Sequence, residues 1–137
     1  MPPAILFVCV ENSCRSQMAE GFARMLGGYG VRAASAGSHP SGVVNPRAIE
    51  VMAEIGYDLS AHRSESLNDI PDIAYDAVIT MGCGDACPWV PAERREDWEI
   101  ADPKDLPLEA FRSIRDDIGR RVRGLLAELG VEPAGPA

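Results

Sequence analysis

The feature that most constrains the fold is an apolar run at residues 4–8, which is followed directly by a polar loop and an amphipathic segment. An uninterrupted apolar run of this length predicts a strand that is buried on both faces of a parallel sheet. The loop reads Cys9-Val-Glu-Asn-Ser-Cys-Arg-Ser16, and the apolar residues after it recur at helical spacing. Backbone N–H groups of such a loop, together with the positive end of a helix, suit a tetrahedral oxyanion. This segment therefore predicts an α/β fold with an oxyanion site between its first strand and its first helix.

The rest of the chain alternates short apolar runs with amphipathic segments. We predict further strands at residues 31–36, 75–81 and 98–100, and helices that begin near Ser16, at Asn45-Pro46 and near Leu108. Strands that alternate with helices indicate βαβ units and a parallel sheet. We therefore expect a single domain over residues 1–137, built as a three-layer α/β/α sandwich with a four-stranded parallel sheet.

The overall composition limits the classes of partner. The 137 residues carry a net charge of −8, which argues against a nucleic-acid partner and against an anionic membrane surface. No stretch approaches the roughly 20 apolar residues of a membrane span, and the N-terminus lacks the basic region of a signal peptide. We therefore expect a cytoplasmic monomer, whose anionic substrate is attracted by a local positive field.

The chain has four cysteines, which lie in two close groups: Cys9 with Cys14, and Cys83 with Cys87. A structural disulfide framework belongs to secreted proteins, and no secretory signal is present. Redox or catalytic chemistry is therefore the favoured interpretation. A zinc site that joins the two groups is the alternative, but it would leave the arginine at the end of the loop without a role.

Cys9 is the candidate nucleophile, because a helix N-terminus and a nearby arginine favour the thiolate form of a cysteine. Arg15 offers a planar guanidinium that binds two oxyanion oxygens. Ser16 can donate a hydrogen bond to the Cys9 sulfur, can cap the helix, or can do both. The residues whose backbone we expect to line the oxyanion site are Val10, Glu11, Asn12, Ser13, Cys14 and Arg15.

Attack on an oxyanion also needs an acid to protonate the departing oxygen. Spacing alone does not choose among the acidic residues near the end of the chain, which are Asp97, Glu99, Asp102 and Asp105.

The segment from Val8 to Gly21 resembles the active-site signature of the thioredoxin-coupled arsenate reductases, which share the low-molecular-weight tyrosine phosphatase fold. Further matching motifs are Ser35-Ala36-Gly37, Asn45-Pro46, Cys83-Gly84-Asp85, Cys87-Pro88 and Asp102-Pro103. The resemblance implies that Cys9 is the nucleophile, that Arg15 and the loop amides bind arsenate, and that Asp102 is the general acid. It gives Cys14 no essential role.

The same resemblance maps two redox cysteines onto Cys83 and Cys87. It implies that Cys9 attacks arsenate, that Cys83 then forms a Cys9–Cys83 disulfide as arsenite leaves, and that Cys87 converts it into a Cys83–Cys87 disulfide. Thioredoxin would reduce that disulfide, so no tightly bound cofactor is needed. The three residues between Cys83 and Cys87 are fewer than in better-known members. A low-molecular-weight thiol, as in the mycothiol- and bacillithiol-coupled enzymes, is therefore the alternative donor.

Some relatives hold a potassium ion near the oxyanion loop. The corresponding residues are Asn12, Glu20, Ser35 and Glu65, with glutamate where those relatives carry aspartate. A solvated loop without a metal is the alternative, and it is the one we favour.

Three functions fit these observations. The first is arsenate reduction for arsenic detoxification, and the second is hydrolysis of phosphotyrosine by the same loop and acid. The third is a non-catalytic regulator that binds an oxyanion or a metal. The pair of Cys83 and Cys87 favours the first, because a phosphatase has no use for an adjacent redox pair.

Overall fold

The computed structural model describes residues 1–82 and 90–132. Within these residues, strands β1 (Ala4–Cys9), β2 (Arg32–Gly37), β3 (Tyr75–Thr80) and β4 (Ala92–Asp97) form one parallel sheet in the order β2-β1-β3-β4. The helices are α1 (Arg15–Gly27), α2 (Pro46–Ala53) and α3 (Leu108–Glu128), with short 3-10 turns η1 (Gly28–Gly30) and η2 (Leu59–Ala61). The parallel α/β arrangement is the one that the sequence predicts.

Strand β1 is central in the sheet, and every one of its residues is buried. Successive side chains of a strand point to opposite faces. Ile5 and Phe7 accordingly belong to the hydrophobic cluster that the helices cover, whereas Leu6 belongs to a second cluster on the other face. This double burial explains why the sequence of β1 is a continuous apolar run rather than an alternating one.

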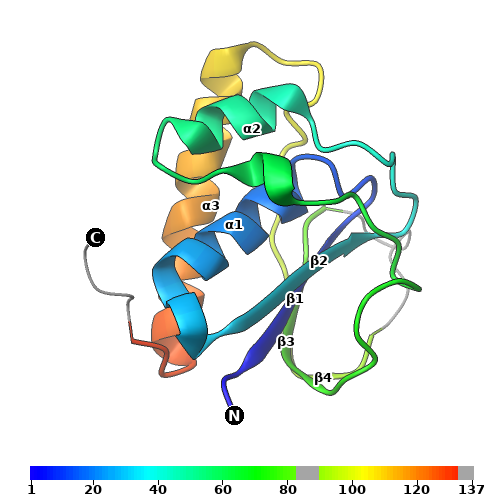
Figure 1. The fold of residues 1–137 in the computed structure, drawn as a ribbon, viewed down its shortest axis with the longest axis vertical. Coiled ribbons are helices and arrows are strands. Elements are labelled where there is room, and N and C mark those ends of the chain that lie inside the picture. Colours follow the sequence, from blue (N-terminus) through cyan, green and yellow to red (C-terminus); the bar gives the residue numbers. More distant parts are fainter. Residues whose placement is uncertain (83–89, 133–137) are drawn as a thin grey trace.

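In the described residues, the three helices all lie on one side of the sheet (Figure 1). Helix α1 packs against α3, and α3 also contacts α2. The buried stripe of α3 recurs at helical spacing, from Phe111 through Ile118 and Val122 to Leu125. The other side of the sheet is covered by Leu67 and Ile70 from the connection before β3. None of these helices, in the described part of the chain, is long and apolar enough to cross a membrane.

The fourth strand is where the sequence prediction was wrong. It runs over Ala92–Asp97 and not over residues 98–100. Strand β4 forms the edge of the sheet, and its residues, Ala-Glu-Arg-Arg-Glu-Asp, alternate between half-buried and exposed. Charged residues are common on edge strands, because they discourage pairing with other chains. Trp98 and Ile100 gave the apolar signal, but they are buried in the connection that follows the strand.

Candidate active site

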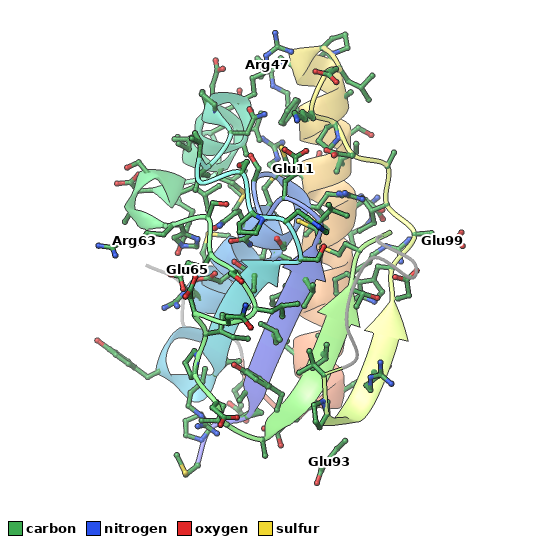
Figure 2. All side chains as sticks on the ribbon, turned by 90° about the vertical axis from the view of Figure 1, so that its right-hand side faces the viewer. Glu11, Arg47, Arg63, Glu65, Glu93 and Glu99 are labelled. Carbon is green, nitrogen blue, oxygen red and sulfur yellow. The ribbon has the colours of Figure 1, made fainter. Side chains whose placement is uncertain are left out.

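The loop between β1 and α1 lies at the carboxyl edge of the sheet, and Figure 2 shows Glu11 of this loop above the tips of the strands. The backbone carbonyls of Val10, Glu11 and Ser13 accept hydrogen bonds from N–H groups in the 39–45 segment, at 2.8 to 3.0 Å. These bonds hold the carbonyls on the outside of the loop. The loop is thereby arranged as an oxyanion cradle requires, with its carbonyls already paired and directed away from an anion.

The neighbouring strand leaves no room for a side chain beside this loop. A Cβ atom on Gly37 would lie 2.6 Å from the Val10 carbonyl oxygen and 3.0 Å from the Asn12 nitrogen. Asn12 itself has a positive φ of 50°, a conformation that asparagine adopts more readily than most residues. Gly37 and Asn12 are therefore the two residue choices that allow the loop to turn tightly against β2.

Cys9 lies at the bottom of the loop and is 2% exposed. Its Sγ is 2.8 Å from the Ser16 hydroxyl, which is the hydrogen bond predicted from the sequence. The side-chain Nδ2 of Asn12 donates to the same hydroxyl oxygen at 2.8 Å. When Cys9 is a thiolate it has no proton to donate, so the Ser16 hydroxyl then donates to the sulfur and stabilises the negative charge. The alternative role of Ser16 as the helix cap was wrong, since the N-cap residue of α1 is Cys14.

The orientation of Asn12 is set by Gln17, which is fully buried. Gln17 Nε2 faces the backbone carbonyls of Asn12 and Arg63, at 3.1 and 2.7 Å, and the Asn12 Oδ1 at 2.9 Å. Backbone carbonyls only accept, so the Gln17 Oε1 is left to accept from His62 Nδ1 at 2.9 Å. The other ring nitrogen of His62 then accepts from the Tyr57 hydroxyl at 2.6 Å.

These contacts form one chain in which every donor points toward the sulfur: Tyr57, His62, Gln17, Asn12, Ser16 and Cys9. Burial lowers the pKa of His62, against the opposing effect of Glu20. His62 is therefore neutral near pH 7, with its proton on Nδ1, and this tautomer is the one that the chain needs.

Arg15 is buried at the start of α1, and its position is fixed by the other segments of the site. Its Nη1 donates to the carbonyls of Met81 at 2.7 Å and Ile100 at 3.0 Å. Its Nη2 lies 3.6 Å from a carboxylate oxygen of Asp102. Cys9, Arg15 and Asp102, which are far apart in sequence, thus line one cavity. The structure brings together the nucleophile, the arginine and the acid that the resemblance implies.

Cys14 lies in the same loop, and its thiol is buried. Burial, followed by the negative charge of Asp102, raises the pKa of its thiol to about 12. A thiol with such a pKa stays protonated near pH 7 and is a weak nucleophile. Cys9 and Cys14 are both free thiols.

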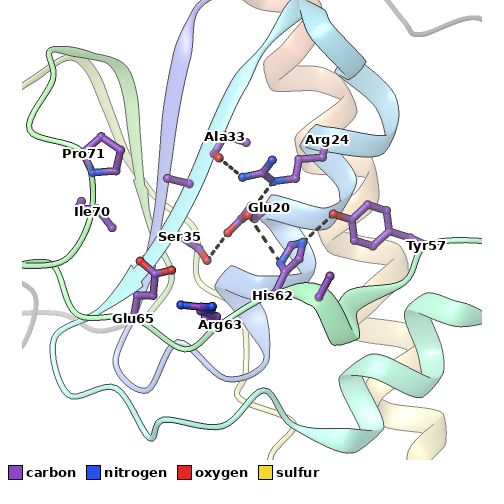
Figure 3. Close-up of a pocket in the computed structure, with 12 residues that line it drawn as sticks. Glu20, Arg24, Ala33, Ser35, Tyr57, His62, Arg63, Glu65, Ile70 and Pro71 are labelled. Atoms are coloured by element: carbon purple, nitrogen blue, oxygen red, sulfur yellow. Dashed lines mark hydrogen bonds and ion pairs between the residues drawn. The ribbon is translucent and has the colours of Figure 1, made fainter.

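The four residues suggested for potassium lie near one another, and three of them, Glu20, Ser35 and Glu65, line one cavity. The Asn12 Oδ1 already accepts from Gln17 and from the Glu65 backbone N–H. The carboxylate of Glu20 accepts from Ser35 at 2.6 Å and pairs with Arg24 at 2.7 Å, as Figure 3 shows. The Arg24 guanidinium therefore supplies the positive charge beside Glu20, and the arrangement does not fit a potassium ion. Part of this cluster lines a cavity of about 540 Å³ that is separate from the Cys9 site.

Cys83 and Cys87 lie outside the described residues. The residue before them, Gly82, is described and has a positive φ of 71°. A Cβ atom on Gly82 would lie 2.9 Å from Arg15 Nη1. Glycine is therefore required here for two reasons, and the chain leaves β3 in contact with the arginine of the oxyanion site.

Comparison with known proteins identifies the family. Residues 4–134 match the family described as low molecular weight phosphotyrosine protein phosphatase. The chain belongs to this family. Within it, the chain is similar to the glutaredoxin arsenate reductase of Synechocystis, with 43% identity over 128 residues that cover 91% of this chain and 97% of that protein.

Solved structures of the phosphatase family give the same relationship. An arsenate reductase in a phosphate-binding state matches with a TM-score of 0.83 and 40% identity, over 92% of this chain and 98% of that one. The thioredoxin-dependent arsenate reductase of Corynebacterium glutamicum matches with a TM-score of 0.80 and 35% identity, over 94% and 62% of the two chains. These relatives confirm the predicted fold class and the resemblance to arsenate reductases.

Sequence reasoning missed the part of the site that supports Cys9 from behind. Gln17, Tyr57 and His62 were not among the site residues predicted from the sequence. Gln17 and His62 are 45 positions apart, so no local spacing connects them. The available signal was the glutamine that directly follows the loop, on a helix with a buried face. Glutamine is usually a surface residue, so this position gave no reason to expect a buried side chain.

Proposed function

We propose that this protein reduces arsenate to arsenite and serves arsenic detoxification. The observation that carries the proposal is the 2.8 Å contact between Cys9 Sγ and the Ser16 hydroxyl, at the bottom of a cavity that Arg15 and Asp102 also line. Hydrolysis of a phosphate ester and reduction of arsenate both begin with such a thiolate. The names of the relatives, together with the second cysteine pair in the sequence, favour reduction.

The first step is the attack of the Cys9 thiolate on arsenic. Arg15 and the loop N–H groups hold the oxyanion, and Asp102 gives a proton to the oxygen that leaves as water. The product is an arsenate that is joined to Cys9 through sulfur. Because Arg15 is already fixed by two backbone carbonyls, little conformational freedom is lost when the oxyanion binds.

The second step is the reduction itself. The Cys83 thiolate attacks the sulfur of Cys9, the sulfur–arsenic bond breaks, and its electron pair leaves with arsenic as arsenite. Two thiols are thereby oxidised to a Cys9–Cys83 disulfide while As(V) becomes As(III). Cys87 then attacks Cys83, and this frees Cys9 and leaves a Cys83–Cys87 disulfide.

The final reductant is an external thiol. Thioredoxin is our first candidate, in keeping with the name of the Corynebacterium relative. Glutaredoxin is the second, because the Synechocystis relative carries that name. A low-molecular-weight thiol that attacks the Cys9 adduct directly is a third route.

The test is arsenate turnover with each donor system in parallel: thioredoxin with its reductase, and glutathione with and without glutaredoxin. Cys9→Ser should abolish turnover but retain phosphate binding, because the cradle is built from backbone and Arg15. Turnover that survives this substitution would contradict the nucleophile assignment. After one turnover without reductant, mass spectrometry should find Cys83 joined to Cys87; intact thiols at both positions would contradict the relay.

Hydrolysis of phosphotyrosine is the second candidate function, because the chain belongs to the phosphatase family and has an acid beside its oxyanion loop. Release of p-nitrophenol from an aryl phosphate, compared with arsenate turnover by the same preparation, decides between the two.

A further inference from the structure

The cavity above Cys9 is narrow. Its volume is about 10 Å³, which is about the space that one water molecule requires. The side chains at its entrance therefore influence how an oxyanion reaches Cys9.

The buried part of the wall is not free to move. Cys9, Cys14 and Arg15 are each at most 7% exposed, and Arg15 is held by two backbone carbonyls. Apart from the proposed acid, the charged side chains that line the cavity and are partly exposed belong to Glu11 and Lys104, at 31% and 49%. Ser13 also lines the cavity, but its hydroxyl is held by the Val43 carbonyl at 2.9 Å.

Glu11 and Lys104 join the two sides of the cavity entrance. Both carboxylate oxygens of Glu11 lie 2.9 Å from the Lys104 ammonium, although the residues are 93 positions apart. The Lys104 backbone N–H also donates to Asp102 Oδ1 at 3.1 Å. The pair therefore connects the oxyanion loop to the segment that carries the proposed acid.

The charges at this entrance are unusual for an anion site. Glu11 and Asp102 place two carboxylates beside a cavity meant for an oxyanion, and like charges there oppose binding. Lys104 is the chain's single lysine. The hydrogen bonds to Glu11 raise the pKa of Lys104, so its ammonium stays charged. Because exposed ion pairs are only weakly stabilising, a dianion can compete for this ammonium.

We propose that Lys104 is an oxyanion-binding residue of this enzyme, which Glu11 holds across the entrance while the site is empty. When a tetrahedral oxyanion arrives, the Lys104 ammonium leaves Glu11, and the entrance opens for the anion. The ammonium then pairs with the bound anion, so that Lys104 covers the ligand. The inference rests on the proposed function only in its choice of a tetrahedral oxyanion as the ligand.

The first test measures the affinity of inorganic phosphate, by calorimetry, for the parent and two single variants. Lys104→Met removes the ammonium and leaves Glu11 unpaired, so phosphate should bind about tenfold more weakly, the scale of one charged hydrogen bond. Glu11→Gln removes the competitor, so phosphate should bind up to about fivefold more tightly, the scale of an exposed ion pair. Arg120→Met is the matched control, because it removes a cation from an exposed ion pair with Asp117 on α3.

The opposite signs of the two variants are the decisive feature. If both variants weaken phosphate binding to the same extent, the pair only holds the loop in place, and the proposal is overturned. Affinities equal to that of the parent would overturn it as well.

The second test follows Lys104 directly with an amine-reactive reagent, and peptide mapping is unambiguous because there is one lysine. In the Glu11→Gln variant the freed amine should react faster than in the parent, and saturating phosphate should protect it again. The N-terminal amine of Met1, which is fully exposed, is the internal reference. No protection by phosphate would overturn the proposal. Neither test uses arsenate, so a failure of arsenate turnover would count against the proposed function and leave this inference standing.

Discussion

The hydrogen bond from Ser16 to Cys9 gives the sharpest prediction about the chemistry. The Ser16 hydroxyl is fully buried, accepts from Asn12 at 2.8 Å and lies 2.8 Å from the Cys9 sulfur. Ser16→Ala removes this donor and leaves a methyl group, which stabilises neither the thiol nor the thiolate. The substitution adds no bulk, so the fold of the loop should be retained.

The size of the effect follows from the charge of the acceptor. A hydrogen bond to a charged group contributes about 1.5 to 3 kcal/mol, and each 1.4 kcal/mol is a factor of ten in an equilibrium. Ser16→Ala should therefore reduce the thiolate population of Cys9 by roughly 10- to 100-fold. The rate of thiolate reactions at pH 7 should fall by the same factor.

The assay is alkylation of Cys9 by iodoacetamide at pH 7, followed by mass spectrometry of the modified peptide. Ser113→Ala, at an exposed position of α3, is the matched control and should react at the parental rate. Phosphate binding reports whether the loop remains folded. If Ser16→Ala binds phosphate and is alkylated as fast as the parent, the hydroxyl does not stabilise the thiolate, and the reasoning from the directed chain of donors fails.

Three further predictions concern the surroundings of the site. Since burial lowers the pKa of His62 below 6.5, the unfolded chain takes up this proton first. The free energy of unfolding should therefore fall below pH 6.5, by up to about 1.4 kcal/mol per pH unit, until the pKa of His62 in the folded state is reached. Urea titrations at several pH values should show that this pH dependence is lost in His62→Gln and kept in His39→Gln. Arg24→Gln should cost about 1 kcal/mol and make the melting temperature higher in KCl than in NaCl, whereas the parent should melt equally in both. Gly82→Ala, at a φ of 71° and against Arg15, should destabilise by about 1 to 2 kcal/mol in urea and weaken phosphate binding.

The part of the site that the sequence predicts is the part that is local. Cys9 and Arg15 belong to one strand–loop–helix segment, so the spacing of six positions already places them around a common point. Asp102 is a different case, because several acidic residues precede α3 and only the resemblance selected one. The structure places it 3.6 Å from Arg15, as expected where parallel strands bring their carboxyl ends to the same edge.

What the sequence did not predict depends on contacts between distant segments. The edge strand β4 was missed because a strand with charges at most positions carries no apolar alternation. Gln17 and His62 were missed because a buried polar pair has no periodic signature. The pairing of Arg24 with Glu20 was within reach, since four positions on a helix bring such side chains together.

Arg15 is the residue at which the separate requirements of the site meet. One side of its guanidinium is held by the carbonyl of Met81, directly after β3, and by that of Ile100, two residues before Asp102. The other side faces the Asp102 carboxylate. A hydrolase of this family needs the cysteine thiolate, the arginine and the acid. A reductase also needs a second thiol to approach Cys9. A Cβ atom on Gly82, the residue before Cys83 in the sequence, would lie 2.9 Å from Arg15 Nη1. Arg15 thus lies beside the last described residues before Cys83, which is where the proposed reduction needs its second thiol.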